Sequence, residues 1–424
     1  MSKNGVFKTK LKNGMTVILK EAHTTPVTTW WVWYRVGSRS ERTGLTGASH
    51  WVEHMMFKGT KQFPAGLLDK AVSRDGGTWN AMTYIDWTTY FETMPADKID
   101  LGLRLEADRM AHSLFPPKEV ESERTVIISE REGSENEPMF QLSELVRKTA
   151  FTVHGYHHET IGDMADLHTM TRDDLYTHYR TYYAPNNAIA VVVGDFDAKK
   201  MLKRIKELYE GLPRGLPIQP FTRPEPPQKG ERRVMVEGED KTAYIEAAYH
   251  APAATDPDFY PMVVLESILA GAGSFNAFGG GTSNKSSRLY KALVETELAA
   301  GVGGGLTASV DPYLFSIVAT VRQGHTLAEV ETALDAEMDR VLNEPVTEAE
   351  LAKAIKQAKA MFAFSAESVT NLGFWYGFAE ILDTYEWFEN YLERLTQVTV
   401  ADVHRVAQKY LTRSNRTVGW YQPK

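Results

Sequence analysis

The chain repeats one stretch of its sequence about half a chain length later, and this repeat restricts the folds open to it. The stretch TRDDLYTHYRTYYAPNNAIAVVV starts at Thr171 and matches TVADVHRVAQKYLTRSNRTVGWY, which starts at Thr399. Each copy predicts a helix with Thr at its N-cap, then a turn at Asn187 or Asn415, then a strand. The sequence therefore predicts two similar halves; the alternative is a chance likeness between two ordinary helix–strand units.

A proline-rich segment lies between the two copies. Six of the 19 prolines fall between Leu212 and Pro227, where neither a helix nor a central strand can form. Such a segment behaves as an extended, semi-rigid spacer. Because 424 residues suffice for two or more domains, we expect an N-terminal domain over 1–211, a linker over 212–230 and a C-terminal domain over 231–424.

Strand patterns and helix patterns alternate in both halves. Asn13-Gly14 between two alternating runs predicts a β-hairpin. Residues 28–37 and 243–251 predict buried strands in equivalent places, each followed by a helix, from Gly44 and from Tyr260. This mixture predicts an α+β fold of two similar domains, each a mainly antiparallel sheet with helices packed on one face.

Composition excludes several classes of protein. The chain has no cysteine, so a disulfide, a thiolate metal site and a cysteine nucleophile are impossible. A net charge of −8 argues against nucleic-acid binding. No apolar run approaches the ~20 residues of a membrane span, and the N-terminal residues lack the apolar core of a signal peptide. We therefore expect a cytoplasmic protein whose metal, if any, is held by His, Asp or Glu.

The segment GASHWVEHMMFKGT has the spacing of a metal site. If it is helical, His50 and His54 stand at i and i+4 on one face, where two imidazoles can share one ion. Glu53 projects beside that face and can reach a metal-bound water. Two histidines suit catalytic Zn²⁺, which takes three protein ligands and keeps one position open.

A carboxylate elsewhere should supply the third ligand. Glu123 and Glu130 are seven residues apart in a segment that Pro116-Pro117 would start as a helix, so both lie on one face about two turns apart. We assign Glu130 to the metal and Glu123 to the orientation of a ligand.

Two other clusters are weaker candidates. His154, His157 and His158 resemble a second metal site, but the Gly and Tyr between them predict a loop. The glycine-rich run Gly271–Asn284 is not followed by Lys and Ser/Thr in the order of a phosphate-binding loop. We interpret it as a long functional loop.

Taken together, these residues resemble the inverzincin peptidases of the pitrilysin type (M16), in the branch of mitochondrial processing peptidase and its bacterial relatives. H-x-x-E-H is the inverse of the common zincin order. The other matching features are the pair Glu123 and Glu130, GGTWNAMTYIDWTTY from Gly76, and SRLYKALVE from Ser287.

The resemblance implies a clam-like chamber formed by two chains, in which peptides short or unfolded enough to enter are cleaved. It implies one Zn²⁺ per chain on His50, His54 and Glu130, with Glu53 as general base. It also implies an edge strand that receives the substrate, formed by Gly77, Thr78, Trp79, Asn80, Ala81, Met82 and Thr83.

The chain departs from the family pattern in its second half. Where active members have an Arg and, seven residues later, a Tyr, this chain has Val294 and Gly301, which donate no side-chain hydrogen bond. We therefore predict a heterodimer with a homologous subunit that carries the Arg/Tyr pair, with a homodimer as the fallback. The glycine-rich loop is a second route to the missing donors.

Two rival functions stay open. One is a zinc-retaining, non-catalytic core or assembly subunit of a peptidase-like complex, although such a zinc site needs no base at Glu53. The other is a non-haem iron oxygenase with two histidines and one carboxylate; helical i, i+4 histidines beside a free Glu favour hydrolysis.

Overall fold

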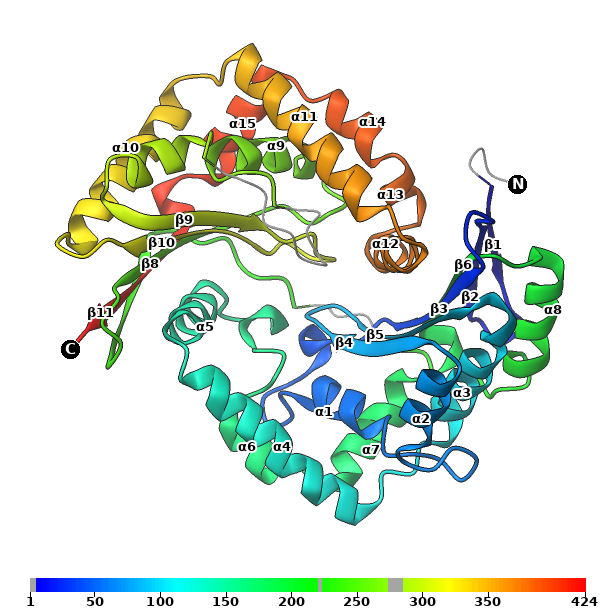
Figure 1. The fold of residues 1–424 in the computed structure, drawn as a ribbon. Helices are drawn as coiled ribbons and strands as arrows, with labels where there is room; N and C mark the ends of the chain where they lie inside the picture. Colours follow the sequence, from blue (N-terminus) through cyan, green and yellow to red (C-terminus); the bar gives the residue numbers. More distant parts are fainter. Residues whose placement is uncertain (1–4, 220–222, 274–284) are drawn as a thin grey trace. The chain divides into compact units, whose positions relative to one another are not determined.

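The computed structural model describes residues 5–219, 223–273 and 285–424, which form two compact units (Figure 1). Unit 1 consists of Met1–Arg131, His158–Thr222 and Ala366–Phe388. Unit 2 consists of Glu132–His157, Arg223–Ser365 and Glu389–Lys424. Each unit is built on one β-sheet.

The sheet of unit 1 has six strands in the order β1-β2-β6-β3-β5-β4, all antiparallel except the pair β2 and β6. The strands are β1 (Val6–Lys10), β2 (Thr16–Glu21), β3 (Val27–Tyr34), β4 (Thr78–Thr83), β5 (Thr88–Pro95) and β6 (Ala188–Gly194). The predicted hairpin at Asn13-Gly14 joins β1 to β2, with Gly14 at a φ of +99°. Strand β4 lies at the edge of the sheet.

Helices cover both faces of this sheet. They are α1 (Ala48–Met55), α2 (Leu67–Arg74), α3 (Asp100–His112), α4 (Pro117–Glu135), α6 (Met164–Thr169), α7 (Arg172–Tyr182), α8 (Ala198–Tyr209) and α12 (Val369–Leu382). The side chains of β3 point alternately to the two faces of the sheet. Trp30 packs in the core under α1, α3 and α7, whereas Trp33 packs against α12 on the other face. A Cβ at Gly377 would lie 2.0 Å from Nε1 of Trp33, so glycine lets α12 approach.

The sheet of unit 2 has the order β7-β11-β8-β10-β9, with only β7 and β11 parallel. Its strands are β7 (Arg232–Gly238), β8 (Tyr244–His250), β9 (Ala299–Leu306), β10 (Leu314–Val321) and β11 (Arg416–Pro423). Its helices are α5 (Pro138–Ala150), α9 (Phe259–Leu269), α10 (Leu327–Asn343), α11 (Glu348–Ser365), α14 (Tyr391–Thr396) and α15 (Val400–Tyr410), and α13 (Glu386–Glu389) spans the unit boundary.

The two units repeat one plan, which confirms the predicted fold of two similar α+β domains. The repeated segments form α7 with β6 and α15 with β11. Both helices begin with a capping box, between Thr171 and Asp174 and between Thr399 and Asp402. In each unit a helix packs on the central strand from the sheet face opposite the other helices: α12 on β3 and α5 on β8.

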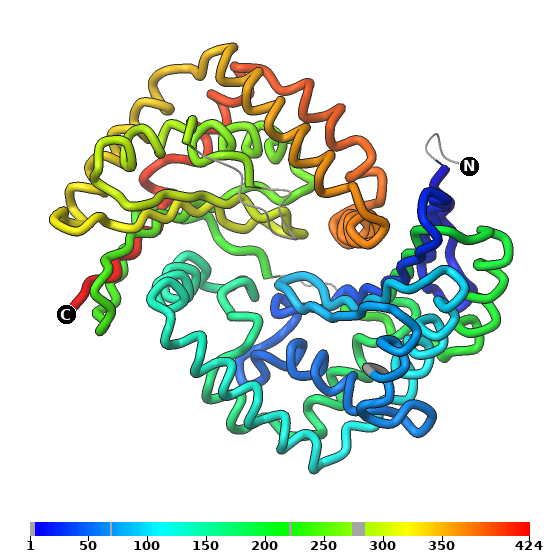
Figure 2. The backbone as a smooth tube through the Cα atoms, in the orientation of Figure 1, coloured from blue at the N-terminus to red at the C-terminus, as the bar shows by residue number. Residues whose placement is uncertain are grey.

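Each unit takes this covering helix from the other half of the sequence. Figure 2 shows the orange segment of α12 beside the blue strand β3. The contact units therefore differ from the halves 1–211 and 231–424. Each sheet buries one apolar face under a helix, and that helix belongs to the same compact unit as the sheet even though it lies in the other half of the sequence. The described residues between 212 and 230 form neither helix nor strand. No helix in the described part of the chain combines the length and apolar character that crossing a bilayer requires.

Candidate active site

Helix α1 contains the H-x-x-E-H motif, and its start is held by a carboxylate from outside the helix. Its N-cap is Gly47 at a φ of +87°, where a Cβ would lie 2.6 Å from the carbonyl oxygen of Ile161. Glu41, which is buried, accepts hydrogen bonds from the N–H groups of Gly47 (2.8 Å) and Ser49 (2.7 Å). It thereby caps α1 in place of an N-cap side chain.

A second buried carboxylate holds the turn before α1. Oδ2 of Asp166 accepts hydrogen bonds from the N–H groups of Gly44 and Thr46 (3.0 Å each) and from the Thr46 hydroxyl (2.7 Å). Since Glu41 and Asp166 fix the entry into α1, the side chains of the motif start from a rigid position.

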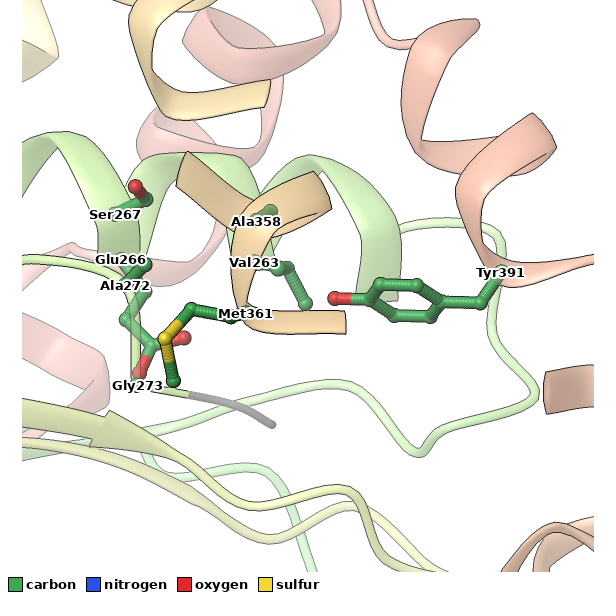
Figure 3. Close-up of a pocket in the computed structure, with 8 residues that line it drawn as sticks. All are labelled: Val263, Glu266, Ser267, Ala272, Gly273, Ala358, Met361 and Tyr391. Atoms are coloured by element: carbon green, nitrogen blue, oxygen red, sulfur yellow. The ribbon is translucent and has the colours of Figure 1, made fainter. Parts of the chain in front are cut away.

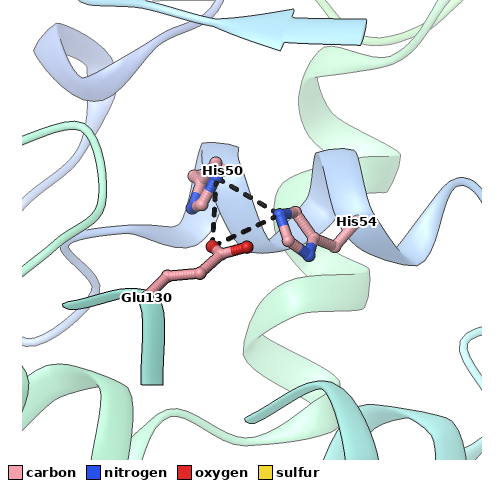
Figure 4. Close-up of side chains that lie close together, drawn as sticks. All are labelled: His50, His54 and Glu130. Carbon is pink, nitrogen blue, oxygen red and sulfur yellow. Dashed lines mark hydrogen bonds and ion pairs between the residues drawn. The ribbon is translucent and has the colours of Figure 1, made fainter. Parts of the chain in front are cut away.

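His50, His54 and Glu130 converge at one point (Figure 4). The two Nε2 atoms are 3.2 Å apart, and Oε2 of Glu130 lies 3.9 Å from that of His50 and 3.8 Å from that of His54. Tetrahedral zinc with Zn–N distances of ~2.05 Å holds two nitrogens about 3.3 Å apart. The three residues therefore fit zinc, and the described chain has no other such group of three or more His, Asp or Glu.

The protonation of His50 suits a metal ligand. Burial, followed by the nearby His54, lowers the pKa of His50 to about 3, so its imidazole is neutral. Its buried Nδ1 has no hydrogen-bond partner among the described residues. A neutral imidazole is the form that binds metals.

His54 is oriented by a carboxylate on α4. Its Nδ1 lies 3.0 Å from Oε1 of Glu123, and Glu123 also pairs with Lys58. When Nδ1 of His54 carries the proton and donates a hydrogen bond to Glu123, Nε2 keeps its lone pair. This lone pair is then available to a metal ion held between His54 and Glu130. Burial alone would lower the pKa of His54, but the hydrogen bond to Glu123 and the charges of Glu53 and Glu130 raise it. Helix α4 thus places both Glu123 and Glu130 within 4 Å of His54.

Glu53 lies on α1 but outside the group of three. Its Oε2 accepts a 2.8 Å hydrogen bond from the hydroxyl of Thr83. Burial raises the pKa of Glu53, with Thr83 and nearby charges in opposition. A carboxylate whose pKa is raised is a stronger base than an ordinary glutamate, which suits proton transfer.

The predicted substrate strand is the edge strand β4. Thr78, Trp79, Asn80, Ala81, Met82 and Thr83 form it, and Gly77 precedes it. It pairs with β5 on one side, and among the described residues no strand pairs with its other side. A Cβ at Gly77 would lie 2.8 Å from Val72 and Met94 side-chain atoms, which explains the glycine. Helix α1 packs against this strand, so the metal group and the free edge belong to one unit.

Unit 2 has no equivalent of the metal group in its described part. By their order in the chain, α9 and α11 correspond to α1 and α4. A small cavity between them is lined by Val263, Glu266, Ser267, Ala272, Gly273, Ala358, Met361 and Tyr391 (Figure 3). One carboxylate among apolar and hydroxyl side chains cannot form a zinc site.

Val294 and Gly301 both lie in unit 2. Val294 ends the π-helical turn Tyr290–Val294, and Gly301 lies in the edge strand β9 opposite Thr320. A Cβ at Gly301 would meet no atom within 4 Å. The fold of this unit therefore leaves room for a larger side chain at Gly301.

The structure describes the histidine cluster His154, His157 and His158 but only the start of the glycine-rich run. His154 is buried, lies 3.2 Å from Asp311 through Nε2 and accepts a hydrogen bond from the N–H of Tyr156, so its contacts are structural. His157 bonds to the carbonyl oxygen of His154. The predicted functional loop falls largely outside the described residues, which exclude 274–284.

The sequence alone does not indicate the roles of Glu41 and Asp166 or the side-chain contact of Thr83. Glu41 lies shortly before the motif, and an acidic residue just upstream of a helix that lacks a polar N-cap residue is a sequence signal for such a cap. Asp166 is 120 residues from Thr46 along the chain, and no local pattern indicates such a contact.

Comparison with known proteins gives matches along almost the whole chain. Residues 16–164 match the family model "Insulinase (Peptidase family M16)", and residues 169–358 match "Peptidase M16 inactive domain". The chain is 29% identical to zinc protease PqqE of Helicobacter pylori, over 97% of this chain and 92% of that protein. It is 25% identical to a probable mitochondrial-processing peptidase subunit beta of Arabidopsis thaliana, over 95% and 76%.

Solved structures show the same fold. A protease from Helicobacter pylori superimposes with a TM-score of 0.92 at 28% identity and covers 99% of both chains. A peptidase M16 inactive domain from Pseudomonas fluorescens superimposes with a TM-score of 0.88 at 19% identity, over 99% of this chain and 98% of that one.

Proposed function

Because the chain belongs to the M16 (insulinase) family of peptidases, we propose that it is a zinc metallopeptidase that hydrolyses peptides or unfolded protein segments. One observation supports this most directly: His50 and His54 join Glu130 in one group, while Glu53 on the same helix stays outside it. A purely structural zinc site does not require a carboxylate that lies beside the ligands without being one of them.

In this proposal each chain holds one zinc ion on His50, His54 and Glu130, and Glu123 orients His54. Bound zinc supplies Lewis acidity, which polarises a carbonyl group and acidifies water. Glu53 accepts a proton from the attacking water and returns it to the leaving amine.

Substrate adds to the free edge of β4. Main-chain N–H and C=O groups of an extended peptide pair with those of Thr78–Thr83, which gives affinity with little demand on sequence. The position of β4 at the edge of the sheet supports this assignment, because β5 is the only strand that pairs with it in the described part of the chain.

A second chain completes the proposed enzyme. Relatives bear the name mitochondrial-processing peptidase subunit beta, so some similar proteins are subunits. Val294 and Gly301 offer no side-chain hydrogen-bond donor, and we infer that a homologous M16-like subunit supplies Arg and Tyr across a chamber formed by the two chains. A homodimer is the fallback. The cytoplasmic location and the sequence domains 1–211 and 231–424 stay predictions.

One other function has a specific observation in its favour. The match of residues 169–358 to an inactive domain, together with Val294 and Gly301, fits a zinc-retaining subunit that does not cleave peptides. Glu53 with its hydrogen bond from Thr83 weighs against it, because an assembly subunit needs no oriented base.

The test uses the purified chain with and without its homologous partner. Metal analysis should give one zinc per chain, and a mixed peptide pool should be cleaved. Glu53→Gln should keep zinc and lose cleavage by about 10²–10⁴-fold, the usual contribution of a general base. Loss of zinc in Glu53→Gln would make Glu53 a ligand, and iron in place of zinc would refute the proposal.

A further inference from the structure

The carboxylate of Glu53 is held by the substrate strand rather than by its own helix. In the described part of the chain its hydrogen-bond partner is the hydroxyl of Thr83, the last residue of β4, at 2.8 Å from Oε2. The family resemblance implies only a main-chain role for Thr83, as one of the seven residues 77–83 along which a peptide docks. Its side chain has a separate contact that this role does not explain.

We propose that Thr83 is a positioning residue for Glu53, holding Oε2 so that Oε1 is the oxygen that takes the proton of the attacking water. This inference rests on the proposed peptidase function. Peptide docking and base orientation then depend on one strand, because the residue that aims the base ends the edge that receives the substrate.

A glutamate needs such a contact if it is to act as an oriented base. The last torsion of a Glu side chain has broad minima, so an unbonded carboxylate rotates freely enough to exchange its oxygens. A threonine hydroxyl is a well-placed donor, since the β-branched side chain has few χ1 rotamers. A carboxylate oxygen that accepts this bond leaves the other oxygen free for water.

The sheet fixes the position of Thr83. Its register partner is Thr88 on β5, a buried residue whose hydroxyl donates to the carbonyl oxygen of Val36 at 3.0 Å. The turn that follows is closed by a 2.8 Å hydrogen bond from the N–H of Tyr84 to the carbonyl oxygen of Trp87. The hydroxyl therefore reaches Glu53 from a rigid hairpin end.

The first test compares Thr83→Val, which keeps the shape of the side chain, with Thr83→Ser, which keeps the hydroxyl. Thr83→Val should lower kcat about 10- to 100-fold, the cost of misplacing a reacting group by about 1 Å. KM should change less than about threefold, zinc content should stay at one per chain, and Thr83→Ser should recover most of kcat. Thr181→Val is the matched control, because Thr181 is exposed on α7 and its hydroxyl donates to the carbonyl oxygen of Thr177 in the same helix.

The second test separates this role from a general effect on folding. In a Glu53→Ala background, Thr83→Val should have no further effect, since two residues that act through one contact are not additive. Crystals of zinc-loaded Thr83→Val should show the Glu53 carboxylate rotated from its wild-type orientation. If Thr83→Val fails to fold, Thr83→Ala against Thr83→Ser makes the same comparison.

The outcomes distinguish the two proposals. A wild-type chain that cleaves nothing, alone or with a partner, overturns the proposed function, and the crystal comparison still tests the contact. Active wild type with equal kcat in the Val and Ser variants overturns the role of Thr83 alone. A Thr83→Val effect that persists in Glu53→Ala does the same.

Discussion

Two buried glutamates share one arginine beside strand β4, the edge proposed to receive substrate. Glu92 and Glu106 are fully buried, and Arg109 is 3% exposed. Glu106 pairs with Arg109 through two hydrogen bonds, one of 2.8 Å from Nε, whereas Glu92 lies 3.7 Å from the same guanidinium. Glu92 stands opposite Trp79 of β4 in the sheet register, so this cluster supports the edge proposed to receive substrate.

The charge balance requires one proton on the pair. Burial, followed by the charge of Glu106, raises the pKa of Glu92 well above its usual value, and neither carboxylate oxygen of Glu92 has a hydrogen-bond partner in the described part of the chain. The raised pKa makes Glu92 the member of the pair that takes up a proton more readily, while Glu106 bonds Arg109 directly. Gln has nearly the shape and the neutrality of a protonated Glu, so the two Glu→Gln changes should differ sharply.

The linkage between proton binding and folding gives the sign and size of the pH-dependent change in stability expected for Glu92→Gln. Between the unfolded pKa, about 4.3, and the raised folded pKa, the native state binds one more proton than the unfolded state, so rising pH destabilises the wild type. The slope for one proton is about 1.4 kcal/mol per pH unit. The glutamine side chain does not titrate and so removes this pH dependence. The stability of Glu92→Gln relative to wild type should therefore rise with pH, by up to about 1.4 kcal/mol per pH unit above the unfolded pKa.

Glu106→Gln should behave differently. It removes the carboxylate that bonds Arg109, and Glu92 then ionises to replace it at a longer distance, at a net cost of about 1–3 kcal/mol. The double variant leaves Arg109 buried without a counter-charge, which costs about 3–5 kcal/mol.

Urea unfolding followed by tryptophan fluorescence measures these differences in unit 1. Eight of the nine tryptophans belong to unit 1, and only Trp420 belongs to unit 2. The midpoint is compared for wild type and the three variants at pH 6, 7 and 8. A Glu92→Gln variant that loses as much stability as the double variant, or whose difference from wild type does not change with pH, would refute the assignment of the proton to Glu92.

Three further predictions concern the metal, the partner and the repeat. Glu130→Ala should remove most bound zinc, whereas Glu123→Ala should weaken zinc binding about 10- to 100-fold; equal zinc retention by wild type and Glu130→Ala in a chelator titration would contradict the ligand set. Val294→Arg combined with Gly301→Tyr should give the isolated chain partner-independent cleavage, because Gly301 has open space around it; full activity of the unmodified chain alone would argue against the heterodimer. Thr399→Ala should lower stability by about 1 kcal/mol through loss of the capping box of α15, seen as a shift of the Trp420 transition.

The sequence predicts those features that local patterns encode. The hairpin at Asn13-Gly14, the capped helices of the repeat and the histidine pair follow from turn chemistry, capping and helical spacing. Glu123 and Glu130 were found because one helix presents both. The exchange of α5 and α12 was not predicted, since an amphipathic helix does not specify which sheet it covers. Contacts such as that of Asp166 with Thr46 join residues far apart in the chain and leave no periodic signal.

The exchanged helices set an order of events during synthesis. Strand β3 leaves the ribosome early, but the face that holds Trp31 and Trp33 has no cover until α12 is made, roughly 350 residues later. At about 5–20 residues per second this interval is about 20–70 s, during which a row of aromatic side chains faces solvent. We therefore expect chaperones to bind the first half of the chain during its synthesis. Expression of either half alone should give an aggregating fragment, whereas co-expression of the two halves should restore a soluble complex.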